Sequence, residues 1–98
     1  MNLSEFNRLV KDSSRRVVIV GAEWCKPCDA LSKNIEQILV GREHLRDRII
    51  KLDVDKEVHL SEDLNIQSVP TIFFIGNGSG ERKTGSISAS KIVEFFDG

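Results

Sequence analysis

The segment VVIVGAEWCKPC, residues 17–28, decides the fold class of this 98-residue chain. Its first four residues form a continuous β-branched run, which is typical of a strand buried on both faces of a sheet. Its end carries two cysteines that enclose Pro27, and proline is favoured in the first turn of a helix. The segment therefore predicts a buried strand that leads directly into a helix.

The predicted helix should run from about Cys25 to about Val40, with Gly41 just beyond its end. Its apolar side chains recur at helical spacing and share one face: Leu31, Ile35, Ile38 and Leu39. Residues 42–48 carry several charges, and we expect them to form a solvated connection.

Periodicity, capping residues and turn residues predict the other elements. In chain order they are a helix over 2–11 capped by Asn2, a strand over 49–54, a helix over 58–64 ended by Asn65, a strand over 71–75, a hairpin loop of about five residues over 76–80, a strand over 81–84, and a last helix capped by Ser88, with Ile87 and Ile92 as a hydrophobic staple. The helices between the first and second strands and between the second and third predict two parallel βαβ units, while the last strand pair is antiparallel. The prediction is one α/β domain over 1–98, with a central mixed four-stranded sheet flanked by helices on both faces.

Composition excludes several functional classes. The 14 basic and 15 acidic side chains give a net charge of -1, so no general polybasic surface exists for nucleic acid or anionic lipid. No apolar run approaches the ~18 residues of a membrane span. The N-terminus lacks a basic stretch followed by an apolar one, so we expect no signal peptide and a cytoplasmic protein.

Cys25 and Cys28 are the two cysteines of the chain. A bridge between them would close a tiny loop and remove little entropy from the unfolded chain, so the pair is a poor structural staple. Either it performs redox chemistry or it supplies half of a metal site. A zinc site would need two more ligands, such as His44 and His59, whose spacing fits no zinc pattern, and an iron–sulfur cluster would have to be shared between two chains.

The position of Cys25 at the start of a helix favours redox chemistry. Unpaired N–H groups and the positive end of the helix dipole favour the thiolate, which is the nucleophile, and Lys26 adds a positive charge. We expect an exposed Cys25 to attack a substrate disulfide, and a more shielded Cys28 to resolve the mixed disulfide. Trp24 and Pro27 would then form an apolar surface around the point of attack.

The chain resembles the thioredoxin family over most of its length, from residue 17 to residue 96. Trp24-Cys25-Lys26-Pro27-Cys28 resembles the active-site motif, and KLDVD at 51–55 resembles the central strand. Val69-Pro70-Thr71 resembles the cis-proline loop, and Gly85 matches the glycine that flanks the substrate groove.

The resemblance implies a thioredoxin fold and a monomeric dithiol–disulfide oxidoreductase with a redox disulfide between Cys25 and Cys28. Its substrates would be disulfide-bearing proteins and its electron donor a thioredoxin reductase or an equivalent. No bound cofactor, metal, membrane or nucleic acid is implied, because the cysteines carry the electrons. A cis Pro70 would expose the backbone at Val69 to an extended substrate, with Pro70 also supporting the site. Lys51 either lies near Cys28 or pairs with Asp53 or Asp55 on the surface.

Several residues depart from the family pattern. Ile19 stands where the family has a buried aspartate that accepts a proton from the second cysteine, and Asp29 replaces a residue that is usually basic. Lys26-Pro27 replaces the common Gly-Pro, and no strand precedes the first helix, as in the glutaredoxin core. Two alternatives therefore stay open: a glutathione-dependent reductase of the glutaredoxin kind, and a non-catalytic binding subunit with a thioredoxin fold.

Overall fold

The computed structural model describes residues 1–85 and 87–97. Its elements are α1 (Leu3–Lys11), β1 (Arg16–Gly21), α2 (Lys26–Leu39), the 3-10 helix η1 (Glu43–Arg48), β2 (Ile49–Asp53), α3 (Val58–Asp63), β3 (Thr71–Gly76), β4 (Ser79–Thr84) and α4 (Ala89–Asp97). The predicted helices and strands are present, with boundaries that differ by one or two residues. The side chain of Asn2 caps α1 as predicted, because it accepts a hydrogen bond from the backbone of Glu5 at 2.8 Å.

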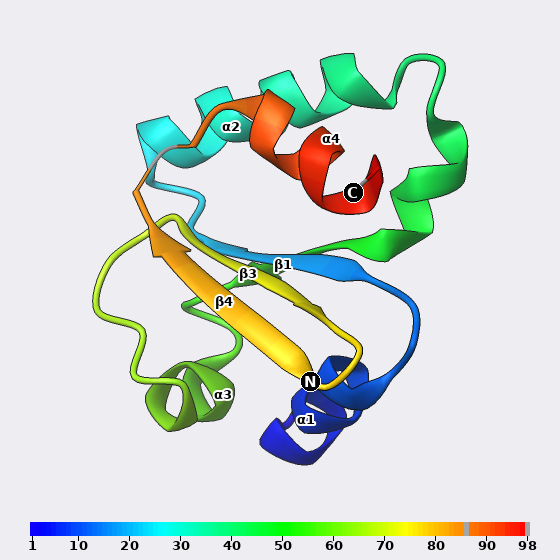
Figure 1. The fold of residues 1–98 in the computed structure, drawn as a ribbon. Helices are drawn as coiled ribbons and strands as arrows, with labels where there is room; N and C mark the ends of the chain where they lie inside the picture. The colour runs from blue at the N-terminus through cyan, green and yellow to red at the C-terminus, as the bar shows by residue number, and fades with distance from the viewer. Residues whose placement is uncertain (86, 98) are drawn as a thin grey trace.

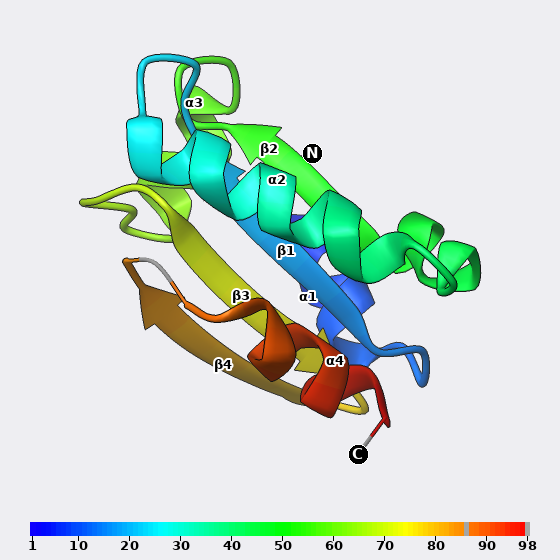
Figure 2. The ribbon, with the colours of Figure 1, turned by 90° about the horizontal axis from the view of Figure 1, so that it is seen from above.

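The described strands form one mixed four-stranded sheet in the order β2-β1-β3-β4. Helices α2 and α4 lie on one face and α1 and α3 on the other (Figure 1). Seen from above, α2 runs along β1 while α4 lies over the β3 side (Figure 2). The α/β fold predicted from the sequence, with helices on both faces, is confirmed.

One predicted strand pairing is wrong. β1 and β2 are parallel, as predicted, but β3 does not pair with β2; it pairs antiparallel with β1. Helix α3 has only six residues, so it is about 9 Å long, whereas a parallel crossover must return over a strand of about 17 Å. The chain therefore stays at one end of the sheet, and β3 begins near the end of β1, with Thr71 opposite Val20.

Side chains of β1 and β3 alternate between two apolar clusters, one on each face of the sheet. The cluster under α2 and α4 contains Val17, Ile19, Leu31, Ile35, Leu39, Leu45, Ile72, Phe74 and Ile92. The cluster under α1 and α3 contains Phe6, Val18, Val20, Leu60, Leu64, Phe73 and Ile75. Because both faces of the central strands are covered, β1 and β3 read in the sequence as continuous apolar runs rather than alternating ones.

The hairpin between β3 and β4 is tighter than predicted. β4 begins at Ser79, which pairs with Gly76, so only Asn77 and Gly78 form the loop. Both loop residues have positive φ angles, 56° and 79°, the conformation that favours Asn-Gly in two-residue hairpins. The cluster of glycines around this dipeptide concealed the short turn within an apparently longer loop.

The segment 42–48 is not a simple solvated connection. It forms η1, and Leu45 is buried in the cluster under α2. The charged residues around Leu45 hid this anchor in the sequence. Among the described residues, no helix is both long enough and apolar enough to cross a membrane.

Candidate active site

The two cysteines lie at the N-terminus of α2, directly after β1. Cys25 is the N-cap residue, with extended φ and ψ angles, and its Sγ accepts the backbone N–H of Cys28 at 3.2 Å. The residues are joined by a disulfide, with their Cα atoms 5.2 Å apart. Pro27 lies in the first turn, where a missing N–H costs no hydrogen bond. The strand-to-helix junction predicted from residues 17–28 is therefore present, with a sulfur atom as its cap.

Both cysteines are buried in this oxidised structure, which contradicts the expectation of an exposed Cys25 and a more shielded Cys28. The exposed fraction is 5% for Cys25 and 8% for Cys28. Ala22 packs beside the pair, and Val54 and Val69 cover it from two other segments. These neighbours, which are distant in sequence, account for the burial that a position at a helix start did not reveal.

The loop before β3 lies against the disulfide. Val69 packs on the two cysteines, and the Val69–Pro70 peptide bond is cis. The backbone N–H of Gly85 donates to the carbonyl of Pro70 at 2.9 Å. The structure therefore brings the residues from 69–70 and 85 to the same end of the sheet as Cys25, as the resemblance implied.

Trp24 is exposed, with 68% of its surface accessible, so it is not part of the core. Its indole Nε1 donates to the carboxylate of Asp55 at 2.8 Å, which holds the ring beside the disulfide loop. Asp55 was not predicted to lie at the site. The signal was its position, because Asp55 follows β2 where the carboxyl ends of two parallel strands meet at one edge of the sheet.

A cleft of about 220 Å³ opens between α2 and β2 and reaches Cys28. Its lining is Ile19, Gly21, Ala22, Glu23, Cys28, Asp29, Ser32, Lys51, Leu52 and Asp53. Ile19 is 6% exposed and belongs to the cluster under α2, so it contributes an apolar side chain to the lining of this cleft. This cleft was not foreseen from the sequence.

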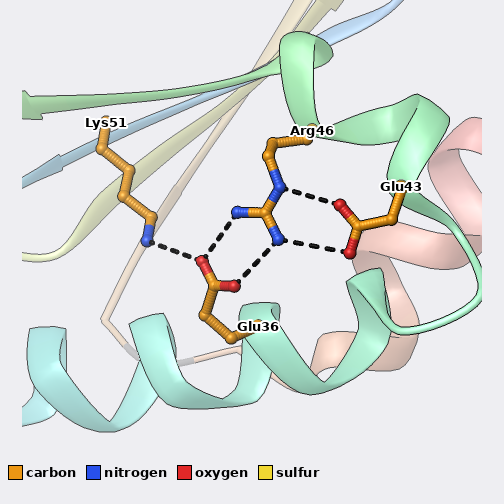
Figure 3. A network of polar contacts seen from close by, with 4 residues as sticks. All are labelled: Glu36, Glu43, Arg46 and Lys51. Atoms are coloured by element: carbon orange, nitrogen blue, oxygen red, sulfur yellow. Dashed lines mark hydrogen bonds and ion pairs between the residues drawn. The ribbon is translucent and has the colours of Figure 1, made fainter.

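Lys51 pairs with neither of the aspartates expected from the sequence. It lines the cleft, but its Nζ lies 3.9 Å from the carboxylate of Glu36 on α2. Arg46 of η1 donates to both carboxylate oxygens of Glu36 at 3.1 Å and also binds Glu43 (Figure 3). Hydrogen bonds from Arg46 hold the pKa of Glu36 below its usual value, and the charge of Lys51 adds to this. Lys51 is thus held toward the far end of α2 rather than toward Cys28.

The remaining candidates do not form a metal site. Lys26 is exposed at the start of α2, and His44 and His59 are exposed on η1 and α3. Within the described part of the chain, no group of three or more histidine, cysteine, aspartate or glutamate residues is arranged to hold a metal ion.

Comparisons with known proteins agree with this geometry. A model of the thioredoxin family matches residues 1–98. A thioredoxin of Mycoplasmoides gallisepticum is 28% identical over 96 residues, which cover 97% of this chain and 94% of that protein. A probable thioredoxin-2 of Caenorhabditis elegans is 36% identical over 78 residues, which cover 79% of this chain and 53% of that protein. The chain spans about half the length of that relative and of a mitochondrial thioredoxin of Mus musculus, of which 54% is covered.

Solved structures show the same fold. A chloroplastic thioredoxin z has a TM-score of 0.76 and 28% identity, with 99% of this chain and 88% of that chain covered. The oxidised mitochondrial thioredoxin 3 of Saccharomyces cerevisiae has a TM-score of 0.75 and 23% identity, with 98% and 90% covered.

Proposed function

Because this chain belongs to the thioredoxin family, we propose that it is a dithiol–disulfide oxidoreductase that reduces disulfides in other proteins. The observation that carries the proposal is the Cys25–Cys28 disulfide at the N-terminus of α2, with the Cys25 sulfur accepting a backbone N–H. In the reduced protein the same N–H would stabilise a Cys25 thiolate, since hydrogen bonds to the charged form favour it.

The proposed reaction has two exchange steps. The Cys25 thiolate attacks one sulfur of a substrate disulfide, forms a mixed disulfide and releases the other substrate sulfur as a thiolate. The Cys28 thiolate then attacks the Cys25 sulfur, which forms the intramolecular disulfide and releases the second substrate thiolate. The substrate gains two electrons and the two cysteines lose them. A reductase of the thioredoxin reductase kind would return the electrons.

The surface around the disulfide suits a protein substrate. Trp24 offers an exposed aromatic face that its bond to Asp55 keeps in place, and Val69 packs against the two cysteines. An extended substrate segment would pair with the backbone at Val69 as an added strand, with Gly85 leaving space beside it. We place the protein in the cytoplasm, where thiols are kept reduced, as part of the same proposal.

Trapping of the mixed disulfide tests the proposal. Reduced Cys28→Ser protein should accumulate a covalent complex with a protein that has one exposed disulfide, because the resolving thiol is missing. Cys25→Ser should accumulate none, and alkylation of reduced wild type at neutral pH should modify Cys25 before Cys28. Trapping by Cys25→Ser, or alkylation of both thiols at the same rate, would reverse the assignment. Faster turnover with glutathione than with a thioredoxin reductase would favour the glutaredoxin-like alternative, and no turnover with either would favour a binding subunit.

A further inference from the structure

The cleft between α2 and β2 bears on the second step of the proposed reaction. Cys28 must lose its proton before it attacks, and a thiol with an ordinary pKa near 8.5 is only about 3% ionised at pH 7. In the oxidised structure Cys28 is 8% exposed, and the cleft is an opening that reaches it. A base that serves Cys28 should therefore line this cleft.

Gly21 allows the Cys28 sulfur to lie close to β1. A Cβ atom at Gly21 would lie 3.2 Å from Sγ of Cys28, which is closer than an ordinary contact, and the cleft of about 220 Å³ that both residues line has room for a water molecule. Gly21 is also the register partner of Asp53 across the parallel β1–β2 pair. Adjacent strands are about 4.8 Å apart and partner side chains share a face, so Asp53 faces the same cleft as Gly21 and Cys28. A water molecule in this cleft would bridge the carboxylate and the sulfur.

Asp53 is better suited than the other charged groups of the cleft. Its Oδ1 accepts the backbone N–H of Asp55 at 2.8 Å, which fixes the side chain, and its second oxygen has no protein donor among the described residues. Glu23 is exposed and pairs with Lys56 at 3.9 Å, and Lys51 is held by Glu36.

The other groups around Cys28 are less suited to take its proton. Asp29 lines the cleft from the exposed side of α2, and Ser32 is not a base at neutral pH. The residues that pack directly on the cysteine pair, Ala22, Val54 and Val69, are apolar. Asp53 is thus the half-buried carboxylate of the cleft with a fixed position beside Gly21.

We propose that Asp53 accepts the proton of Cys28 through a water molecule held in the cleft that Gly21, Cys28 and Asp53 line. The inference rests on the proposed function. The thiol proton moves to the water as the water passes a proton to the carboxylate, and the Cys28 thiolate attacks the Cys25 sulfur of the mixed disulfide. The bond from Cys25 to substrate breaks, and the substrate thiolate leaves and takes a proton from solvent. Asp53 then returns its proton to solvent through the cleft.

Single-turnover kinetics of Asp53→Asn test the proposal, with Asp29→Asn as the matched control because it removes the same charge from the same cleft. Reduced protein is mixed with a protein that has one exposed disulfide, quenched in acid, and the mixed disulfide is followed over time. Asp53→Asn should form it at the wild-type rate but resolve it at least about tenfold more slowly at neutral pH, a modest general-base effect. Asp29→Asn should resolve it within about twofold of wild type, because the exposed carboxylate of Asp29 is not the group that takes the proton of Cys28.

The pH profile separates a base from a charge. Resolution by wild type should change little between about pH 6 and 8, whereas Asp53→Asn should gain about tenfold per pH unit as Cys28 ionises in solvent. If Asp53 acted only through its charge, its removal would increase the thiolate fraction of Cys28, and resolution would become faster.

A second variant tests the water path with Asp53 intact. Gly21→Ala adds a methyl group between β1 and the sulfur, which narrows the cleft at Cys28, and should also slow resolution without slowing formation of the mixed disulfide. Resolution by Asp53→Asn at the wild-type rate, or equal slowing by Asp29→Asn, would overturn the assignment of Asp53. If Cys28→Ser forms no mixed disulfide at all, the proposed function itself fails, and this inference falls with it.

Discussion

Replacement of Ile19 by aspartate should make the stability of the protein strongly dependent on pH. Ile19 is 6% exposed and packs under α2, so either a carboxyl or an amide at this position loses the apolar contribution of about 1.5–3 kcal/mol. Only the carboxyl adds a cost for burying charge. Asparagine, which has the same shape and does not ionise, is therefore the matched control.

The size of the ionisation cost follows from the surroundings of Ile19. Burial raises the pKa of a carboxyl by up to about 3–5 units in a fully dry site. Here the adjacent cleft admits water and Lys51 is the register partner of Ile19, so we expect the pKa of the new carboxyl to rise by only about two pH units. At about 1.4 kcal/mol per unit this costs about 3 kcal/mol of unfolding free energy.

The sign of the pH dependence is fixed by the direction of this shift. Because the folded pKa of the new carboxyl lies above the unfolded value of about 3.9, the ionisation cost is absent below pH 4 and complete above the folded pKa, near pH 6. Denaturant melts of Ile19→Asp and Ile19→Asn should therefore agree near pH 3.5 and differ by about 3 kcal/mol at pH 7. A difference that stays constant between these pH values would show that residue 19 is not in a low-dielectric site.

Two further substitutions test other parts of the structure. Gly76→Ala should destabilise the protein by about 2–5 kcal/mol in denaturant melts, because Gly76 has φ +143° and an added Cβ would lie 3.0 Å from the backbone of Arg15. Gly41→Ala is the control and should cost only about 1 kcal/mol, because Gly41 has φ +81° but no atom within 4 Å of an added Cβ. Equal losses of stability in the two variants would refute this account of the Gly76 contact. Arg46→Gln should raise the pKa of Glu36 toward its ordinary value in an NMR titration, since hydrogen bonds from Arg46 lower this pKa in the wild type. Arg48→Gln is the control and should leave the pKa of Glu36 unchanged. A larger change in this pKa for Arg48→Gln than for Arg46→Gln would contradict the network in Figure 3.

Local patterns in the sequence were sufficient for the elements and for the position of the cysteine pair at a helix start. The β-branched run before Cys25 predicted a buried strand and Pro27 predicted a helix start, because both depend on a few neighbouring residues. Strand order could not be predicted in the same way, since the pairing of β3 with β1 depends on the position that the chain reaches after the six-residue helix α3.

The site details missed from the sequence all depend on residues brought together by the fold. The burial of Cys25 comes from Val54 and Val69, which lie in other segments. The bond from Trp24 to Asp55 and the pairing of Lys51 with Glu36 likewise join distant positions. Side-chain partners on a polar surface are chosen by geometry rather than by any local pattern, so charge alone did not predict them.

The use of a sulfur atom as the cap of α2 means that the environment of the reactive atom needs little reorganisation during a catalytic cycle. In the oxidised form the N–H of Cys28 already points at the sulfur of Cys25. When the Cys25 sulfur leaves as a thiolate, the N–H of Cys28 is already in position to stabilise its negative charge, so the backbone does not have to rearrange. Preorganised dipoles of this kind lower the barrier to reactions that develop charge at a fixed point. Under the proposed function, the same helix terminus would therefore serve both the formation and the reduction of the disulfide.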